Sequence, residues 1–304
     1  SMKDISSRCH VSIATVSKAL NNRGDISDET KERICQVAKE LGYLPNSSAR
    51  ALKTNRTYNI GVLFVDKANC GLTHSYFSHV LDSFRRGAEE EGYDITFISQ
   101  HAGKNKLSYY EHSKYRGVDG VVIACVDFED EAILELVNSE IPVVTIDYSF
   151  HNKSSILSDN VTGMEEIVQY VVGMGHRDIA YIHGADSGVT EHRLRSFYRT
   201  MKDLHVPVRD EWVREGVYHD PESAARITNE LLTLSNRPTC IIYPDDFACV
   251  GGLNEIESQG LSVPDDISVV GYDGQRISQV IEPRLTTYKQ NTEEVSGTKV
   301  SGSH

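Results

Sequence analysis

The chain has 304 residues, of which 39% are hydrophobic and 25% charged, and its formal net charge at pH 7 is −13. A chain of this length and composition is typical of a globular protein with one small module and a larger body that divides into two lobes. No apolar stretch approaches the roughly 18 residues that a membrane-spanning helix needs, and no apolar signal core stands at the N-terminus, so we expect a cytoplasmic protein.

The six cysteines are scattered along the chain without CxxC or any other metal-like spacing. Cysteines within apolar or helical runs of an intracellular protein are usually reduced thiols that act as small hydrophobic side chains. We therefore expect neither disulfides nor a zinc site.

The charge is unevenly distributed. Residues 1–57 carry ten Lys and Arg against six Asp and Glu, whereas the rest of the chain carries 21 against 38. A basic excess this small is within the ordinary variation of a protein surface, so charge alone does not indicate a polyanionic partner. Whether the N-terminal segment binds such a partner must be judged from its local pattern of residues.

The N-terminal segment has the pattern of three short helices. We expect a first helix at residues 4–10, and Ser12 then stands where the N-cap of a second helix belongs, with Val16 and Leu20 on one face at i+4 and i+8. A third helix is expected from its N-cap Ser27 to Gly42. Three short helices bury only a small core, and a helix-turn-helix is the commonest use of that arrangement.

The second helix has small and polar residues at its outward positions. A helix that enters the major groove needs such positions because its backbone must come close to the bases and the phosphates. The hydroxyl-bearing residues that suit phosphate contacts are Ser12, Thr15 and Ser17, and the outward residues that suit base edges are Ile13, Ala14 and Lys18. A Ser/Thr-rich surface helix without a DNA partner is the alternative, and periodicity alone does not separate the two.

Two longer motifs resemble a known family. "KDISSRCHVSIATVSKALNN" and "ISDETKERICQVAKELGYLPNSSARAL" are similar to the DNA-binding head and hinge of the lactose/galactose repressor (LacI/GalR) family of bacterial transcription regulators. The resemblance rests on VSxxTVSxxLN, a downstream SxxTxxRI helix and LGYxPNxxARxL at consecutive spacings. It continues through "YNIGVLFV", "RGVDGVVIA", "IPVVTID", "GHRDIAYIHG" and "VPDDISVVGYD", and so covers nearly the whole chain.

The resemblance implies a contact for each of several residues in the head. Ser12, Thr15 and Ser17 match phosphate-contacting and helix-packing positions, and Asn21 matches a backbone contact at the helix end. The family's base-contacting positions are occupied by Ile13, Ala14 and Lys18. Ile13 and Ala14 offer only apolar contact, for example to a thymine methyl group, whereas Lys18 can donate to guanine acceptors.

The resemblance also implies a hinge at residues 46–57. Asn46, Ala49 and Leu52 match a segment that forms a short helix on DNA, with Leu52 as a wedge that opens a base step from the minor groove. Considered alone, "PNSSARAL" is typical of a loop, and Leu52 is then an ordinary linker residue.

Beyond residue 57, apolar segments alternate with helical ones, which is typical of parallel sheets with crossover helices. Strands are expected at residues 60–65, 95–98, 120–124, 143–146, 179–183, 240–243 and 267–270. Helices are expected at residues 76–91, 129–139, 163–174, 191–204, 221–235 and 247–259. The fold class is therefore α/β, with two doubly wound parallel-sheet lobes whose strands end at a shared crevice where ligands of such sheets bind.

The resemblance implies a periplasmic-binding-protein-like body that closes on a small effector. We expect a helix-turn-helix domain at residues 1–45, the hinge, and a body at residues 58–304 that binds the effector and dimerises. The first lobe is expected at about 58–157 plus 285–304, and the second at about 158–284. The resemblance further implies a final helix on the first lobe, which the polar tail "NTEEVSGTKVSGSH" is not expected to form.

The resemblance also implies which residues contact the effector, which is a sugar, a sugar phosphate or a nucleobase. These are Tyr76, Phe77, Asp147, Asp159, Arg193 and Asp245. The two aromatic rings would stack on a sugar or base, and the pair of Arg193 and Asp245 would hold hydroxyls or polar ring atoms. The departures from the family are Pro244 and Asp246 beside Asp245, and Ser196 in place of a common glycine.

Each effector assignment has a structural alternative. Tyr76 and Phe77 could pack at the start of a helix, and Asp147 and Asp159 could cap loops and helices. The choice among effectors stays open because of the departures at Pro244, Asp246 and Ser196.

No catalytic constellation accompanies these motifs. The sequence has no His/Cys/Asp cluster with metal spacing, no Gly-rich phosphate loop and no GxSxG elbow, and the adjacent Asp245 and Asp246 must point in different directions. We expect no enzyme, no cofactor and no metal.

The function that we expect is a homodimeric repressor that binds double-stranded operator DNA and loses or gains affinity when the effector binds. A sugar-binding receptor without DNA-binding function is the alternative. It predicts a signal peptide and no basic head.

Overall fold

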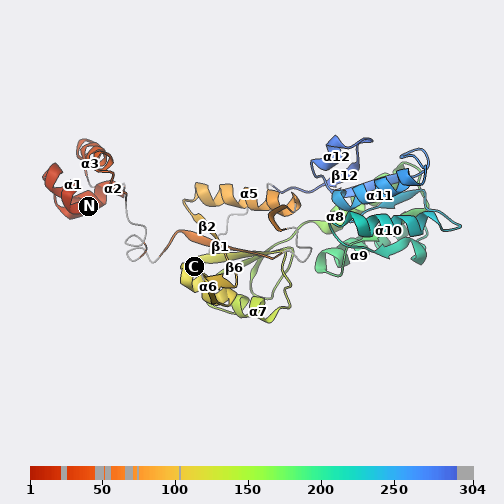
Figure 1. The fold of residues 1–304 in the computed structure, drawn as a ribbon, viewed down its shortest axis with the longest axis horizontal. Helices are drawn as coiled ribbons and strands as arrows, with labels where there is room; N and C mark the ends of the chain where they lie inside the picture. Colours follow the sequence, from red (N-terminus) through yellow and green to blue (C-terminus); the bar gives the residue numbers. More distant parts are fainter. Residues whose placement is uncertain are drawn as a thin grey trace. The chain divides into compact units, whose positions relative to one another are not determined.

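The computed structural model describes residues 1–21, 26–44, 51, 56–65, 71–73, 75–102 and 104–292. The chain divides into two compact units, Ser1–Tyr58 and Asn59–His304 (Figure 1). Three residues expected in the hinge, Asn46, Ala49 and Leu52, lie outside the described residues. No helix in the described part of the chain is long and apolar enough to cross a membrane.

The described residues of the first unit include three helices: α1 (Met2–Cys9), α2 (Ile13–Leu20) and α3 (Asp28–Glu40). They enclose a small core of Ile5, Cys9, Val16, Ala19, Ile34 and Ala38. The first helix begins two residues earlier than expected because Ser1 and Asp4 form a capping box at its N-terminus. Gly42, with a φ of 59°, takes the left-handed conformation that ends α3 where the sequence predicts.

The second unit has two parallel sheets of five strands among the described residues, and each forms one lobe. The first sheet has the order β2-β1-β5-β6-β7, made of β1 (Asn59–Phe64), β2 (Asp94–Phe97), β5 (Gly120–Ala124), β6 (Val143–Ile146) and β7 (Ser154–Ile156). The second has the order β12-β11-β10-β8-β9, made of β8 (Ile179–His183), β9 (Val213–Glu215), β10 (Cys240–Ile242), β11 (Ser268–Asp273) and β12 (Thr286–Lys289). A separate two-stranded hairpin consists of β3 (His101–Ala102) and β4 (Asn105–Lys106).

Helices cover both faces of the first sheet (Figure 1). They are α5 (Ser75–Glu90), α6 (Tyr109–Arg116) and α7 (Glu131–Val137). Successive side chains of β5 alternate between the two faces: Val122 and Ala124 pack with α5, whereas Val121 and Ile123 pack with α6 and α7. The continuous apolar run of β5 therefore marks a central strand that is buried on both sides.

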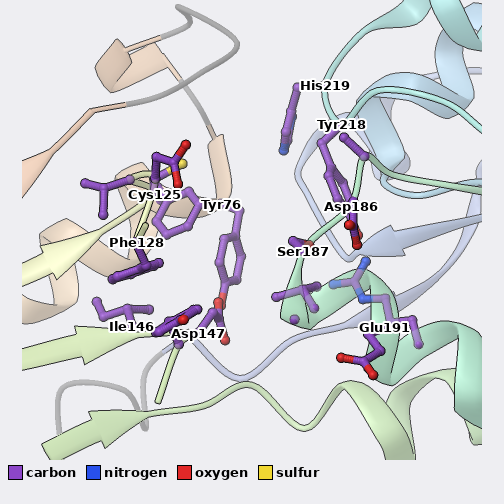
Figure 2. Close-up of a pocket in the computed structure, with 18 of the residues that line it drawn as sticks. Tyr76, Cys125, Phe128, Ile146, Asp147, Asp186, Ser187, Glu191, Tyr218 and His219 are labelled. Carbon is purple, nitrogen blue, oxygen red and sulfur yellow. The ribbon is translucent and has the colours of Figure 1, made fainter. Parts of the chain in front are cut away.

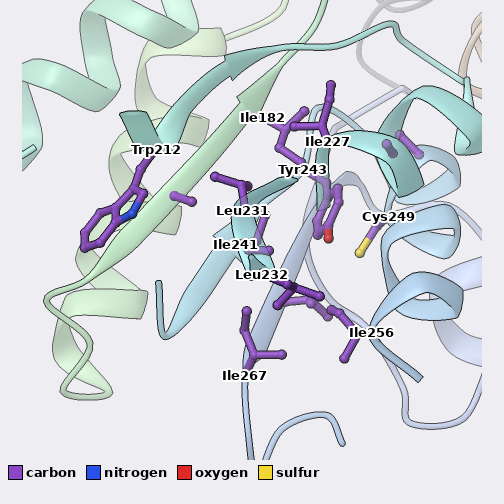
Figure 3. Packing of buried hydrophobic residues seen from close by; sticks show 14 of the residues in the cluster. Ile182, Trp212, Ile227, Leu231, Leu232, Ile241, Tyr243, Cys249, Ile256 and Ile267 are labelled. Carbon is purple, nitrogen blue, oxygen red and sulfur yellow. The ribbon is translucent and has the colours of Figure 1, made fainter. Parts of the chain in front are cut away.

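The second sheet is covered in the same way by α8 (Asn160–Gly173) and α9 (Gly188–Asp203) on one face and α10 (Pro221–Leu232) and α11 (Asp246–Ser258) on the other. Figure 3 shows the second of these layers, in which Ile182 and Ile241 of the sheet meet Ile227 and Leu231 of α10. The described part of the chain also forms the short helices α12 (Ile277–Val280), η1 (Gly71–Thr73) and η2 (Asp210–Trp212). The predicted α/β class with two doubly wound lobes is confirmed.

The expected return of the chain to the first lobe at residue 285 is wrong for the strand that begins there. Thr286–Lys289 is β12, which pairs in parallel with β11 of the second sheet. Leu285 is 8% exposed within the core beside α10 and α11, and Tyr288 packs against the opposite core layer. Burial on both sides of this segment keeps it in the second lobe.

Candidate functional site

The helix α2 presents one face to solvent. Ile13 is 43% exposed, and Ala14 and Lys18 are exposed as well, while Val16 and Ala19 are buried against α1 and α3. Ala14 and Lys18 are one helical turn apart and Ile13 adjoins them, so the three side chains assigned to base contacts share one solvent-facing surface.

The polar residues of α2 fix the two ends of the helix. Ser12 is the N-cap: its Oγ accepts from the Thr15 backbone N–H at 3.0 Å and lies 2.9 Å from Thr15 Oγ1. At the other end, Asn21 Nδ2 donates to the Ser17 carbonyl at 2.6 Å. Ser12 and Asn21 are nevertheless exposed, so these capping roles leave polar atoms that solvent or a phosphate can reach.

A cavity of about 640 Å³ lies in the second unit, lined by residues from both lobes (Figure 2). Its lining residues follow the carboxyl ends of the strands: Cys125 after β5, Asp147 after β6, Ala185 and Asp186 after β8, Val217 after β9, Asp273 at the end of β11 and Gln290 after β12. Counted along the chain within each lobe and apart from the hairpin, both sheets have the order 2-1-3-4-5. In sheets of this order, the carboxyl edge is where ligands bind.

Three residues at these strand ends have strained backbone conformations. Cys125, Asp147 and Asp273 have φ values of 58°, 58° and 97°, in the left-handed region that non-glycine residues seldom occupy. All three line the cavity. Such strain persists only where the surrounding structure imposes it, and it is concentrated at functional sites.

The wall contributed by the first lobe is aromatic. It contains Tyr76, Phe77, Phe128 and Tyr148. Phe128 and Tyr148 are stacked with ring centroids 4.3 Å apart, and Tyr76 meets Phe77 edge to face at 5.1 Å. Flat aromatic surfaces of this kind bind the apolar face of a sugar or the plane of a base.

Asp147 joins this wall to the segment that leaves the first lobe. Its Oδ1 accepts from the Ser158 backbone N–H at 2.8 Å, and the Ser158 hydroxyl lies 2.9 Å from the Tyr76 hydroxyl. Burial raises the pKa of the Asp147 carboxyl and the pKa of the Tyr76 phenol. Asp147 therefore lines the cavity and also holds the segment around Ser158 by a hydrogen bond.

The wall contributed by the second lobe is built around Arg193, which is 3% exposed. Its Nε donates to Asn160 Oδ1 at 2.8 Å and its Nη1 to the Pro244 carbonyl at 2.9 Å. The guanidinium lies 3.5 Å from the centroid of the Tyr272 ring. Burial opposes the charged form, but the surrounding tyrosines and Asp273 outweigh it and raise the pKa of Arg193.

Asp273 is the anionic partner of Arg193. Its Oδ1 lies 3.9 Å from Arg193 Nη2 and accepts from Gln290 Nε2 at 2.6 Å. The carboxylate is 7% exposed, and burial raises its pKa. An arginine and a carboxylate that are both nearly buried thus line the second-lobe side of the cavity.

Four of the six expected effector residues line the cavity, namely Tyr76, Phe77, Asp147 and Arg193. Asp159 does not, because it is the N-cap of α8 and accepts from the Thr162 N–H at 3.0 Å. Asp245 does not either: it is fully buried and accepts from the backbone N–H groups of Phe247, Ala248 and His219 at 2.8 to 2.9 Å. The expected pair of Arg193 and Asp245 is therefore replaced by Arg193 and Asp273.

The neighbouring Asp246 points elsewhere, as expected for adjacent carboxylates. It accepts from the Gln275 backbone N–H and from Thr287 Oγ1, both at 2.5 Å. Burial raises the pKa of this carboxyl to about 7. Asp245 and Asp246 thus fasten α11 to the loops around the carboxyl edge of the second sheet.

Several lining residues were not anticipated from sequence, among them Phe128, Tyr148, Asp186, Tyr218, His219 and Asp273. For Asp273 a signal was present, since "ISVVGYD" is an apolar strand that ends in a carboxylate, as "PVVTID" does. The expected strand stopped at residue 270, three residues before the observed end of β11. A predicted strand that continued to residue 273 would have placed Asp273 at the carboxyl edge of the sheet, where ligands bind.

Comparison with known proteins identifies the family. Residues 1–46 match the sequence family described as bacterial regulatory proteins, lacI family, and residues 168–300 match the periplasmic binding protein-like domain. The probable HTH-type transcriptional repressor ExuR of Bacillus subtilis (strain 168) is 32% identical over 299 residues, which cover 97% of this chain and 88% of that protein. The HTH-type transcriptional repressor PurR of Serratia proteamaculans (strain 568) is 31% identical over 298 residues, which cover 96% and 86%.

Solved structures agree with the fold. The lac repressor dimer bound to operator and the anti-inducer ONPF is 26% identical, with a TM-score of 0.80 over 99% of this chain and 90% of that one. The transcriptional regulator CelR in complex with cellobiose is 22% identical, with a TM-score of 0.69 over 97% and 89%, and supports the fold alone. The chain belongs to the lacI family of bacterial regulatory proteins, DNA-binding transcriptional regulators with an effector-binding domain.

Proposed function

We propose that the protein is a homodimeric transcriptional repressor that binds a pseudo-palindromic operator, and that a small effector in the cavity controls its operator affinity. The observation that carries the DNA-binding part is the exposed surface of Ile13, Ala14 and Lys18 on α2, which is held by a three-helix core. Two copies of this helix would lie in successive major-groove half-sites.

The residues of the head divide into two kinds of contact. Ser12, Thr15, Ser17 and Asn21 would bind phosphates and fix the position of α2 along the duplex, since hydroxyl and amide groups at helix ends suit phosphate oxygens. Specificity would come from Ile13, Ala14 and Lys18, with Lys18 donating to guanine acceptors. In the linker, Asn46, Ala49 and Leu52 would form the hinge, and Leu52 would enter the minor groove.

The effector would bind between the aromatic wall of the first lobe and the charged wall of the second. A ligand that contacts both lobes changes operator affinity only if it binds two arrangements of the protein with different affinity. The cavity satisfies the structural requirement of such coupling because its lining comes from both lobes. The solved lac repressor dimer, which is bound to operator and an anti-inducer, supports this proposal.

We divide the chain into a helix-turn-helix domain at residues 1–45, a hinge at 46–57 and an effector-binding and dimerisation domain from residue 58. The named relatives are transcriptional repressors, which supports a regulator that acts in the cytoplasm and is not an enzyme.

The DNA-binding proposal is tested by selection from random oligonucleotides at low ionic strength, followed by titration of the selected duplex. We expect a palindromic site whose affinity falls steeply with salt, because phosphate contacts release counterions. Lys18→Ala should relax the base preference at one position of each half-site and cost about 1–3 kcal/mol on the selected site. Lys39→Ala on α3, also exposed, is the matched control and should keep the preference. A purified protein that selects no sequence would overturn the proposal.

A further inference from the structure

The cavity has a strong excess of negative charge. Among the residues that the structure describes, six carboxylates and one guanidinium line it: Asp127, Glu129, Asp147, Asp186, Glu191, Asp273 and, as the cation, Arg193. Figure 2 shows that this charge comes from both lobes, with Asp147 on the first-lobe side and Asp186 and Glu191 on the second. An excess of one sign in a partly enclosed site selects ligands by charge because the surrounding protein reduces screening by solvent.

Arg193 does not offset this excess for a bound ligand. Its guanidinium already donates to Asn160 and to the Pro244 carbonyl, and it lies 3.9 Å from the Asp273 carboxylate. The positive charge is therefore balanced by Asp273 before any ligand arrives. What Arg193 and Asp273 offer is a fixed pair of hydrogen-bonding groups, both more than nine-tenths buried, that suits hydroxyls.

The acidic residues outside this pair remain more exposed. Asp127, Glu129, Asp186 and Glu191 are all exposed, and Glu191 is partly offset by an exposed ion pair with Arg195 at 2.6 Å. Asp127 Oδ1 also accepts from the Glu129 backbone N–H at 3.1 Å, which fixes the acidic loop that follows β5. With Asp273 balancing Arg193, these four exposed carboxylates and the partly buried Asp147 make the surroundings of a bound ligand acidic.

The aromatic wall also favours uncharged or cationic ligands over anionic ones. The stacked rings of Phe128 and Tyr148 present the negative faces of their π systems, which attract cations and the C–H bonds of a sugar ring. An anionic group placed against these faces gains nothing from them. Both walls therefore disfavour the same ligands.

We propose that the cavity selects its effector by charge. It takes a hydroxylated ring that is uncharged or bears an ammonium group, and it rejects the corresponding carboxylate and phosphate derivatives. This inference depends on the proposed function, because it assumes that the effector binds in the cavity. It narrows the class of effector by excluding sugar acids and sugar phosphates.

The test is a binding panel in which only the charge varies. Glucose, galactose and mannose are each compared with their amino, uronic acid and 6-phosphate derivatives by thermal shift and by calorimetry on the full chain, with adenine and hypoxanthine as uncharged bases. We expect at least one neutral or amino compound to bind, and its acid and phosphate derivatives to bind at least about tenfold more weakly. The difference should shrink as salt is added, because screening reduces like-charge repulsion.

A variant then tests whether the acidic residues cause the weaker binding of anionic ligands. The triple variant D127N/D186N/E191Q should reduce the ratio of the acid's Kd to the neutral compound's Kd by about tenfold, because like-charge repulsion is removed while side-chain size is kept. The control E257Q removes an exposed carboxylate of α11 that does not line the cavity and should leave the ratio unchanged. The ratio is a useful readout because a general loss of affinity affects both ligands.

The outcomes separate the two proposals. A uronic acid or phosphate that binds as tightly as its neutral parent would overturn charge selection and leave the effector site in place. A triple variant whose ratio does not change would also overturn it. A panel in which no compound binds would count against the cavity as an effector site, and with it against both proposals.

Discussion

The two lobes share a topology and differ in chemistry. Each has five parallel strands in the order 2-1-3-4-5 and helices on both faces, and each turns the carboxyl edge of its sheet to the cavity. At that edge the first lobe places a stacked pair, Phe128 and Tyr148, and the second a buried pair, Arg193 and Asp273. Because the two sheets have the same strand order, the difference lies in the side chains that each lobe places at the carboxyl edge.

This division assigns different binding roles to the lobes. Aromatic stacking is tolerant of ligand orientation within the plane of the ring, whereas an arginine and a carboxylate with fixed partners demand hydroxyls at defined positions. The first lobe should therefore contribute affinity, and the second both affinity and the choice among stereoisomers. Variants in either lobe test this division of binding roles.

The largest effect is expected from Arg193→Ala in the second lobe. The substitution leaves Asp273, Asn160 and the Pro244 carbonyl without their buried donor, which should cost about 3–5 kcal/mol in the free energy of unfolding. Effector binding by the tightest member of the sugar panel should fall by at least about 100-fold, since each 1.4 kcal/mol is a factor of ten. Urea unfolding and calorimetry measure the two effects.

Arg199→Ala on the same helix is the control for Arg193. Arg199 forms an exposed ion pair with Glu165 at 3.0 Å, so its loss should change stability by less than about 1 kcal/mol. Arg193→Lys keeps the charge but not the planar fork, and it should still lose discrimination among stereoisomers. Equal stability of Arg193→Ala and the unmodified protein would contradict the assigned role of the buried cluster.

A smaller effect is expected from Phe128→Ala in the first lobe. Phe128 is half-buried and stacks on Tyr148, so its removal should weaken effector binding by about tenfold and cost about 1 kcal/mol in stability. Affinities for glucose, galactose and mannose should fall in parallel, because stacking does not distinguish hydroxyl positions. Phe97→Ala, a 53% exposed ring on β2, is the control. If Phe128→Ala instead changed which sugar binds best, the division between the lobes would be wrong.

Strong periodic segments made most of the fold predictable from sequence. The central strands β5, β6 and β8 were predicted with their observed ends because a continuous apolar run leaves little choice of register or limits. The short strands β7 and β9 were missed, since three residues at a sheet edge carry little pattern. The strand β12 was assigned to the wrong lobe because its place depends on long-range packing of Leu285 and Tyr288.

The candidate site was predictable where the ligand edge follows directly from a strand end. Among the effector contacts that the resemblance implies, Asp147 and Arg193 line the cavity, and Asp147 directly follows a predicted strand. Asp245 was expected to face the ligand but caps α11 instead. A carboxylate that follows a strand can either face the ligand or cap the next helix. The amino-acid sequence alone does not distinguish these two orientations. Phe128 and Tyr148 lie in different loops, so their stacking exists only in the folded chain.

The smallest effect is expected from Asp159→Ala, which distinguishes a helix cap from a ligand contact. Asp159 Oδ1 accepts from the Thr162 N–H at the start of α8 and lies outside the cavity, so the substitution should cost about 1 kcal/mol in stability through the lost cap. Its effector affinity should equal that of the unmodified protein, in contrast to Arg193→Ala on the adjoining helix. Asp159→Asn keeps an oxygen that can cap α8 and should restore most of the stability. If Asp159→Ala lost affinity while its unfolding free energy stayed constant, the residue would belong to the charged wall of the second lobe, and that wall would extend to the first turn of α8.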